Sequence, residues 1–199
     1  MLPNVSPEPP TGPRGKPVTR RTVLSRRDAL TAEERVAATA RISEDVEGLL
    51  RSLPAGAVVG LYAAKGSEVA TDDIDRRVRA MGLRVAYPRV VDGAKRLVFA
   101  EAEIGELVGG RFGLREPAPG AREIELSDIA AFIVPGIAFD RGGGRIGWGH
   151  GHYDATLTAA PAAVRIGVAF ECQVLDHVPR DPHDALLHHV VTEVASYRR

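Results

Sequence analysis

One glycine-rich stretch, residues 135–154, holds most of the side chains whose types and spacing could do chemistry. Seven glycines fall between positions 136 and 151, and three of them alternate directly before an expected helix: Gly147, Gly149 and Gly151. Glycine lets the backbone adopt positive φ and approach a ligand closely. Backbone N–H groups at the start of a helix bind anions, and Arg145 adds a fixed cation with several donors for phosphate oxygens. The stretch is therefore predicted to hold phosphate.

Two other chemistries fit parts of the same stretch. The glycines at 142, 144 and 147 match a dinucleotide fingerprint, but that motif places its first glycine directly after a strand and opens the helix inside the motif. The spacing His150-x-His152-x-Asp154 resembles the zinc motif of metallo-β-lactamase-like hydrolases, since imidazole nitrogens and a carboxylate can ligate zinc. The histidine that this motif requires next is replaced by Ala155. A zinc hydrolase stays open as an alternative.

The elements that must position this stretch can be predicted from apolar spacing and capping residues. Strands are predicted over residues 57–62, 83–87, 96–101, 129–134, 164–170 and 190–193. Helices are predicted over about 19–30, 31–52, 71–82 and 153–159, and residues 102–127 are predicted to be mostly loop. Thr31 and Glu34 fit a capping box at the start of the second helix. Thr71 is predicted to cap the third.

The alternation of strands and helices implies parallel pairing through crossovers. The predicted fold class is α/β: a single three-layer domain with a mostly parallel sheet flanked by helices. In such sheets, ligands bind at the carboxyl ends of the strands. The loops after residues 62, 134 and 170 are therefore expected to form the site.

Composition excludes several classes of protein. The 199 residues are 44% apolar and 26% charged, which predicts one globular domain. No apolar run approaches the roughly 20 residues that a membrane helix needs. Equal numbers of Lys+Arg and Asp+Glu, 26 each, argue against general nucleic-acid binding. The single cysteine, Cys172, fits a reducing compartment, and a cytoplasmic location is expected.

The N-terminal part of the chain differs from the rest. Residues 1–17 contain six of the fourteen prolines and are predicted to form a disordered tail, so the folded domain is expected over 18–199. Residues 1–30 carry six Lys/Arg against two acids, a local excess of four positive charges. Two interpretations stay open for these charges. They could form a solvated helix face, or an arm that folds over an anionic ligand.

The glycine-rich stretch, together with four other segments, resembles the 5-formyltetrahydrofolate cyclo-ligase family. Residues 134–157, VPGIAFDRGGGRIGWGHGHYDATL, are similar to the family signature, roughly PG-x-x-FD-x-x-G-x-R-(L/I)-G-x-G-x-G-x-YD. Further matches lie, in the family's order, at residues 16–35, 68–71, 112–117 and 167–193. The resemblance spans about residues 16–195. This chain departs from the family pattern at Trp148, His150 and His152.

The resemblance implies an ATP-dependent ligase that forms a C–N bond. The family converts 5-formyltetrahydrofolate and ATP into 5,10-methenyltetrahydrofolate, ADP and phosphate, with Mg²⁺ as cofactor. ATP would phosphorylate the formyl oxygen, and N10 would then attack the activated carbon. The protein would hold two ligands in line and screen the phosphate charge. The folate, with or without a polyglutamate chain, is the expected partner of a monomer or weak homo-oligomer.

The resemblance also implies roles for individual residues. Arg145 and Asp154 are expected to be catalytic. The expected ATP-binding residues are Lys16, Arg20, Arg145, Ile146, Gly147, Trp148, Gly149, His150, Gly151, His152 and Tyr153. The expected folate-binding residues are Tyr62, Glu68, Trp148 and His152, and the expected Mg²⁺ ligands are Asp154 and Asp184. A relative that binds nucleotide or folate without catalysis stays open as an alternative.

Overall fold

The computed structural model describes residues 15–199, so residues 1–14 of the predicted tail lie outside the described residues. The first helix begins at Lys16, which is two residues before the predicted domain boundary. Residues 16 and 17 therefore belong to the folded part of the chain. Over residues 15–199, every helix is too short or too polar to span a bilayer.

Four α-helices form within the described range: α1 (Lys16–Asp28), α2 (Ala32–Leu50), α3 (Asp72–Ala80) and α4 (His152–Ala159). The predicted capping box at α2 is confirmed, because the Glu34 N–H donates to Thr31 Oγ1 at 3.2 Å and the Thr31 N–H donates to Glu34 Oε2 at 2.8 Å. The predicted side-chain cap of α3 is wrong. The Thr71 hydroxyl instead donates to the carbonyl oxygen of Tyr62 at 2.5 Å. This bond ties the start of α3 to the chain that leaves the first strand.

One mixed sheet of eight strands forms the centre of the molecule. In spatial order its strands are β13 (Ser196–Arg198), β12 (His189–Val191), β10 (Val164–Val168), β7 (Ile129–Val134), β1 (Val58–Gly60), β2 (Arg84–Arg89), β3 (Val98–Glu101) and β6 (Glu123–Ile124). The five strands from β12 to β2 pair in parallel, whereas β13, β3 and β6 pair antiparallel. The predicted mostly parallel sheet is confirmed. The short strands β6 and β13 were not predicted.

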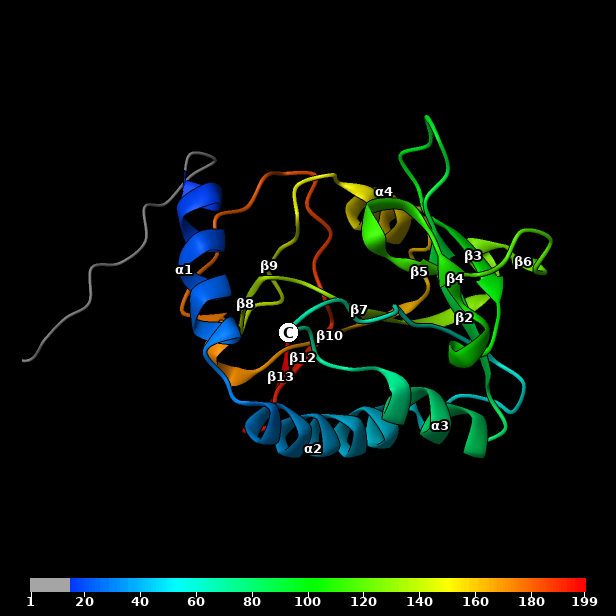
Figure 1. Cartoon of the computed structure of the whole chain (residues 1–199), viewed down its shortest axis with the longest axis horizontal. Helices are drawn as coiled ribbons and strands as arrows, with labels where there is room; N and C mark the ends of the chain where they lie inside the picture. The colour runs from blue at the N-terminus through cyan, green and yellow to red at the C-terminus, as the bar shows by residue number, and fades with distance from the viewer. Residues whose placement is uncertain (1–14) are drawn as a thin grey trace, which may run out of the picture.

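Side chains of the central strand β7 alternate between two apolar cores, as the period of a strand requires. Ala131 and Ile133 pack with α2 and α3 on one face. Phe132 and Val134 pack on the other face, beneath α4. Figure 1 shows α2 and α3 along one side of the sheet and α4 on the opposite side, which confirms the predicted three layers. Helix α1 lies apart, against β8 (Ala138–Asp140).

The glycine-rich stretch contains a hairpin as well as a loop. Strand β8 pairs antiparallel with β9 (Arg145–Ile146) and parallel with β11 (Val174–Leu175). The carboxylate of Asp140 is buried and accepts hydrogen bonds from the Gly144 N–H at 2.8 Å and the Val178 N–H at 3.1 Å. A Cβ at Gly144 would lie 2.5 Å from Asp140 Oδ2, so only glycine fits there. The hairpin fixes the point from which residues 147–151 extend.

The remaining elements are short. Strands β4 (Val108–Gly109) and β5 (Arg115–Glu116) form a separate hairpin within the region predicted to be loop. Short 3₁₀ turns occur at Ile104–Glu106, Arg111–Gly113, Leu126–Asp128 and Glu171–Gln173. The β4–β5 hairpin stands on the α4 side of the sheet, across from α1 (Figure 1).

Candidate active site

A cleft of about 750 Å³ opens at the carboxyl ends of the parallel strands. Its wall includes Tyr62 after β1 and Pro135 after β7, so the site lies at two of the three predicted loops. The segment directly after residue 170 does not line the cleft, which corrects the third expectation. Glu171–Gln173 instead packs against α1, and the chain reaches the cleft only at residues 181–184.

Every site residue named from the sequence lines this one cleft. They are Lys16, Arg20, Tyr62, Glu68, Arg145, Ile146, Gly147, Trp148, Gly149, His150, Gly151, His152, Tyr153, Asp154 and Asp184. These residues come from α1, the loop after β1, the β9–α4 segment and the loop before β12. Tertiary folding brings together segments separated by up to 168 positions.

Arg145 is fixed by contacts on both ends of its guanidinium group. Only 5% of its side chain is exposed. Its Nη2 donates to Asp154 Oδ1 at 2.9 Å, and its Nη1 donates to the carbonyl oxygen of Pro135 at 3.2 Å. Its Nε has no hydrogen-bond partner among residues 15–199. Arg145 is therefore a pre-oriented cation in the wall of the cleft.

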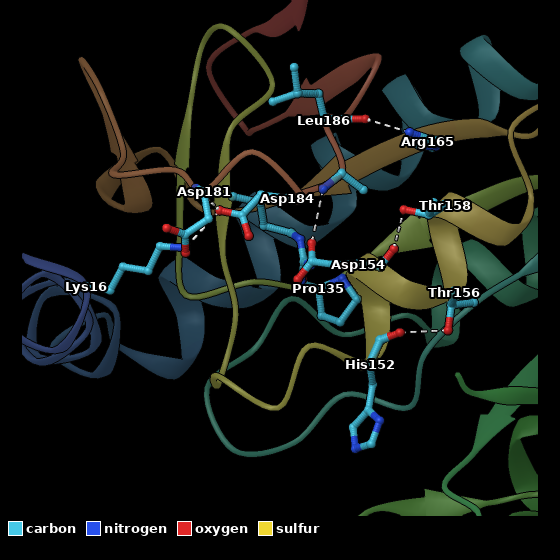
Figure 2. Close-up of polar contacts among 12 residues, drawn as sticks. Lys16, Pro135, His152, Asp154, Thr156, Thr158, Arg165, Asp181, Asp184 and Leu186 are labelled. Atoms are coloured by element: carbon cyan, nitrogen blue, oxygen red, sulfur yellow. Dashed lines mark hydrogen bonds and ion pairs between the residues drawn. The ribbon is translucent and has the colours of Figure 1, made fainter. Parts of the chain in front are cut away.

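Asp154, in the first turn of α4, joins this wall to the chain before β12. Its Oδ1 also accepts a hydrogen bond from the Ala185 N–H at 3.3 Å, which brings Asp184 alongside. In Figure 2 the Asp184 carboxylate is turned toward Lys16 and Asp181, whereas the Asp154 carboxylate lies on the α4 side of it. The two predicted Mg²⁺ ligands thus lie on the same wall, although their positions in the sequence are 30 residues apart.

Lys16 forms ion pairs with Asp181 at 2.7 Å and Asp184 at 2.8 Å. Burial would lower the pKa of Lys16, but the two carboxylates outweigh that effect and raise it. Burial would likewise raise the pKa of Asp184, but Lys16 and the Asp181 N–H hold it below its ordinary value. These ion pairs therefore hold the start of α1 against the wall of the cleft.

Arg20 fastens α1 to the glycine-rich loop one turn further along. Its Nε donates to the carbonyl oxygen of Gly147 at 2.7 Å. Gly149 has φ +102, and a Cβ there would lie 3.2 Å from Arg20 Nη2. Of the two interpretations of the basic segment, the structure supports an arm, because Lys16 and Arg20 both face the cleft.

The zinc alternative is wrong, because its three residues do not converge. The His152 ring points away from Asp154 (Figure 2), and its Nδ1 lies 3.0 Å from the carbonyl oxygen of Lys95. Asp154 is paired with Arg145 instead. Over residues 15–199, the one group of three potential ligand residues within 4.8 Å of one another is Asp181, His183 and Asp184. This group belongs to the charged cluster around Lys16.

Glu68 lies on the other side of the cleft, in the loop after β1. Its Oε2 accepts a hydrogen bond from the Lys65 N–H at 3.0 Å, and its Oε1 accepts one from Trp148 Nε1 at 3.4 Å. Burial raises the pKa of Glu68. Tyr62 is only 4% exposed, and its hydroxyl donates to the carbonyl oxygen of Val69 at 2.7 Å. Tyr62 is thus both a core residue and part of the wall.

Sequence reasoning missed several residues of this side. Phe112 stacks on His150 with ring centroids 5.1 Å apart, and His150 lies 5.8 Å from His152. Lys65 Nζ donates to the carbonyl oxygen of Phe112. Phe112 and the buried Glu116 carried a signal, since both lie in the matched segment 112–117. The lining residues Lys65 and Lys95 carried none.

Comparison with known proteins agrees with this architecture. Residues 13–193 match the 5-formyltetrahydrofolate cyclo-ligase family. A 5-formyltetrahydrofolate cyclo-ligase of Mycolicibacterium smegmatis is 32% identical over 90% of this chain and 94% of its own length. One of Escherichia coli K12 is 31% identical over 67% and 76%.

Two solved structures have the same fold. The 5,10-methenyltetrahydrofolate synthetase of Aquifex aeolicus has a TM-score of 0.74 at 32% identity and matches 92% of each chain. The corresponding protein of Mycoplasma pneumoniae has a TM-score of 0.73 at 23% identity, with 89% of this chain and 98% of that chain covered.

Proposed function

The chain belongs to the 5-formyltetrahydrofolate cyclo-ligase family, and we propose that the cleft described above binds ATP along α1 and the glycine-rich loop and the folate beside Glu68. It converts 5-formyltetrahydrofolate to 5,10-methenyltetrahydrofolate in an ATP-dependent reaction. The observation that supports the proposed layout is that cations and a carboxylate from distant segments line one cleft. Two ligands that must react with each other need such a shared space.

The reaction closes a ring by way of an activated oxygen. The formyl oxygen attacks the γ-phosphorus of ATP, and the bond from that phosphorus to the bridging oxygen breaks to release ADP. N10 then attacks the formyl carbon, loses its proton, and phosphate departs with the former formyl oxygen. The protein contributes alignment and charge stabilisation, as in other phosphoryl transfers.

Arg145 is proposed to stabilise the negative charge on the transferred phosphoryl group. Its guanidinium is held by Asp154 and the Pro135 carbonyl, so it need not reorganise when charge develops. Arg20 and Lys16 would supply further positive charge along the phosphates. The backbone of residues 147–151 leads into α4, and its N–H groups are proposed to bind phosphate oxygens.

The carboxylates near α4 fit a Mg²⁺ ion that accompanies ATP. Hard carboxylate oxygens are the ligands Mg²⁺ prefers, and Asp154 uses only Oδ1 in its hydrogen bonds within the described residues. Asp154 and Asp184 would hold the ion, and Asp181 and His183 have potential ligand atoms within 4.8 Å of those of Asp184. Bound there, Mg²⁺ would neutralise phosphate charge. Lys16 would keep Asp184 ionised for this role.

Glu68 is proposed to accept hydrogen bonds from N–H groups of the pterin ring. Both of its oxygens act purely as acceptors only in the carboxylate form. Burial disfavours that form, so nearby donors and cations must stabilise it. Tyr62, Trp148 and His152 would complete the folate side. The substrate is proposed to be 5-formyltetrahydrofolate with or without a polyglutamate chain. The protein is proposed to act in the cytoplasm, as a monomer or a weak homo-oligomer.

The test follows methenyltetrahydrofolate by its near-ultraviolet absorbance, with and without ATP. We expect a rise only when ATP is present. Glu68→Gln removes a charged acceptor, and a hydrogen bond to a charged group contributes about 1.5–3 kcal/mol, so the folate KM should rise about tenfold to a hundredfold. The KM for ATP should not change. Glu125→Gln, at an exposed position outside the cleft, is the matched control. An unchanged folate KM in Glu68→Gln would refute the assignment.

A further inference from the structure

Helix α1 carries more than the two cations that line the cleft. Lys16, Arg20, Val23 and Arg27 are spaced four, three and four residues apart, so they share one face of the helix. Lys16 and Arg20 reach the cleft on its nucleotide side, whereas Arg27 does not line the cleft. Arg27 is nevertheless only 3% exposed. Its burial on this face calls for a different explanation.

The contacts of Arg27 lead to the loop that carries Glu68. Arg27 Nε donates to Ser67 Oγ at 2.9 Å, and the Ser67 hydroxyl in turn donates to Asp28. Ser67 precedes Glu68 directly in the chain. Arg27 Nη1 has no hydrogen-bond partner among residues 15–199. A buried guanidinium with an unpaired N–H donor destabilises the folded state. If the role of this position were purely structural, an apolar side chain would be more favourable there.

Arg27 forms no ion pair with Glu68, but its hydrogen bond to Ser67 holds its positive charge next to the residue that precedes Glu68. Burial raises the pKa of Glu68, while the positive charges of Arg27 and Lys65 oppose that rise. The hydroxyls of Tyr62 and Tyr153 also interact with Glu68, and both are neutral because burial raises their pKa values. The carboxylate on the Arg27 side is Asp28, which accepts from the Ser67 hydroxyl. Arg27 is therefore the buried cation behind the Glu68 carboxylate, whereas the side chain of Lys65 is exposed.

We propose that Arg27 is a positioning residue for the folate side of the reaction: it fixes the 65–68 loop through Ser67 and faces the Glu68 carboxylate with a positive charge from behind the cleft. The inference rests on the proposed role of Glu68 in folate binding. One helix then serves both ligands, with its first half facing the nucleotide and its last turn supporting the folate acceptor.

The test measures kcat/KM for 5-formyltetrahydrofolate as a function of pH in the full-length protein. Removing the charge in Arg27→Gln makes the ionised form of Glu68 less favourable, so its pKa rises and the acid limb of the profile moves to higher pH. A shift of one pH unit corresponds to about a tenfold loss on the acid side, and activity should recover as the pH is raised. The KM for ATP should stay unchanged. Arg26→Gln, the exposed neighbour on the same helix, is the control and should match the wild type.

Two further variants separate charge from contact. Arg27→Lys keeps the charge and should retain the wild-type acid limb. Ser67→Ala removes the acceptor of Nε but leaves the charge, so the folate KM should rise severalfold with no shift of the limb. A loss in Arg27→Gln that is equal at every pH, or that extends to the KM for ATP, would show a purely structural role and overturn the inference. If Arg27→Gln does not fold, a shifted limb in Arg27→Lys or a wild-type folate KM in Ser67→Ala overturns it instead.

The Glu68→Gln variant keeps the two proposals apart. If Glu68→Gln leaves the folate KM unchanged, the folate role of Glu68 fails, and the inference fails with it. If Glu68→Gln raises that KM while Arg27→Gln behaves like Arg26→Gln, only the role of Arg27 fails.

Discussion

The two sides of the cleft are built in different ways. On the proposed nucleotide side, each cation already has fixed partners: Lys16 lies between two aspartates, Arg20 contacts the Gly147 carbonyl, and Arg145 contacts Asp154. On the proposed folate side, two aromatic side chains are largely exposed to solvent, with Phe112 54% and Trp148 56% exposed. There the Glu68 carboxylate accepts one backbone hydrogen bond and one long bond from Trp148.

This difference predicts how the two sides respond to change. Charges held in place before the ligand arrives stabilise bound phosphates or a transition state without reorganisation, so their loss should raise the KM for ATP or lower kcat. Exposed aromatic side chains can change rotamer when a ligand binds, so their loss should alter the folate KM by small amounts. Three substitutions test this contrast, in order of decreasing effect.

The largest effect is expected from Arg145→Gln. Removing a pre-oriented donor to developing charge should lower kcat about a hundredfold to a thousandfold. Arg145→Lys keeps the charge but not the two-armed contact to Asp154 and Pro135, so it should recover only part of the loss. The measurement is the ATP-dependent rise in methenyltetrahydrofolate absorbance at saturating substrates. Arg141→Gln, an exposed position in the neighbouring turn, should keep the wild-type kcat. If Arg145→Gln had the kcat of the wild type, the proposed difference between the two sides of the cleft would be refuted.

A smaller effect is expected from Lys16→Met, which removes the cation between Asp181 and Asp184. The KM for ATP should rise about tenfold, the scale of one charge-assisted contact. The pKa of Asp184 is held below its ordinary value of 3.8 in the folded protein. A depressed carboxyl pKa stabilises the fold above the unfolded pKa, and this contribution is lost as the pH falls through the folded pKa.

The thermal unfolding temperature of Lys16→Met should therefore lie below that of the wild type at neutral pH. The difference should shrink as the pH falls below 3.8. Arg21→Gln, an exposed cation on the same helix, should show neither effect. An equal drop in unfolding temperature at neutral and acidic pH would mean that the Lys16 cluster does not stabilise the fold through charge.

The smallest effect is expected from Trp148→Phe, which keeps an aromatic ring but removes the donor to Glu68. Because that hydrogen bond is 3.4 Å long and largely exposed, the folate KM should change less than about threefold, with kcat unchanged. Trp148 is the only tryptophan in the chain. Its fluorescence in the wild type should change when 5-formyltetrahydrofolate is added without ATP. A constant signal, or a tenfold change in kcat, would place Trp148 with the rigid side of the cleft.

Much of the fold follows from local pattern. The capping box at Thr31 and Glu34 and the apolar runs of β1, β2, β7 and β10 are short-range signals, and each formed where it was expected. Short edge strands such as β6 and β13 were missed, because two or three residues carry too little periodicity to be recognised. The Thr71 hydroxyl was assigned to the wrong partner, since its acceptor, the Tyr62 carbonyl, lies nine residues earlier in the chain.

The sequence by itself determined the α/β class, the glycine-rich loop proposed to bind phosphate, and many of the residues that line the cleft. Only the tertiary structure decided how their charges are paired. Lys16 meets Asp181 and Asp184 more than 160 positions away, and Arg27 reaches Ser67 across 40. The physical reason is that a residue type and its local spacing fix what a side chain can donate, accept or bury. Which partner it finds depends on how helices and strands pack, and that is set by the whole core.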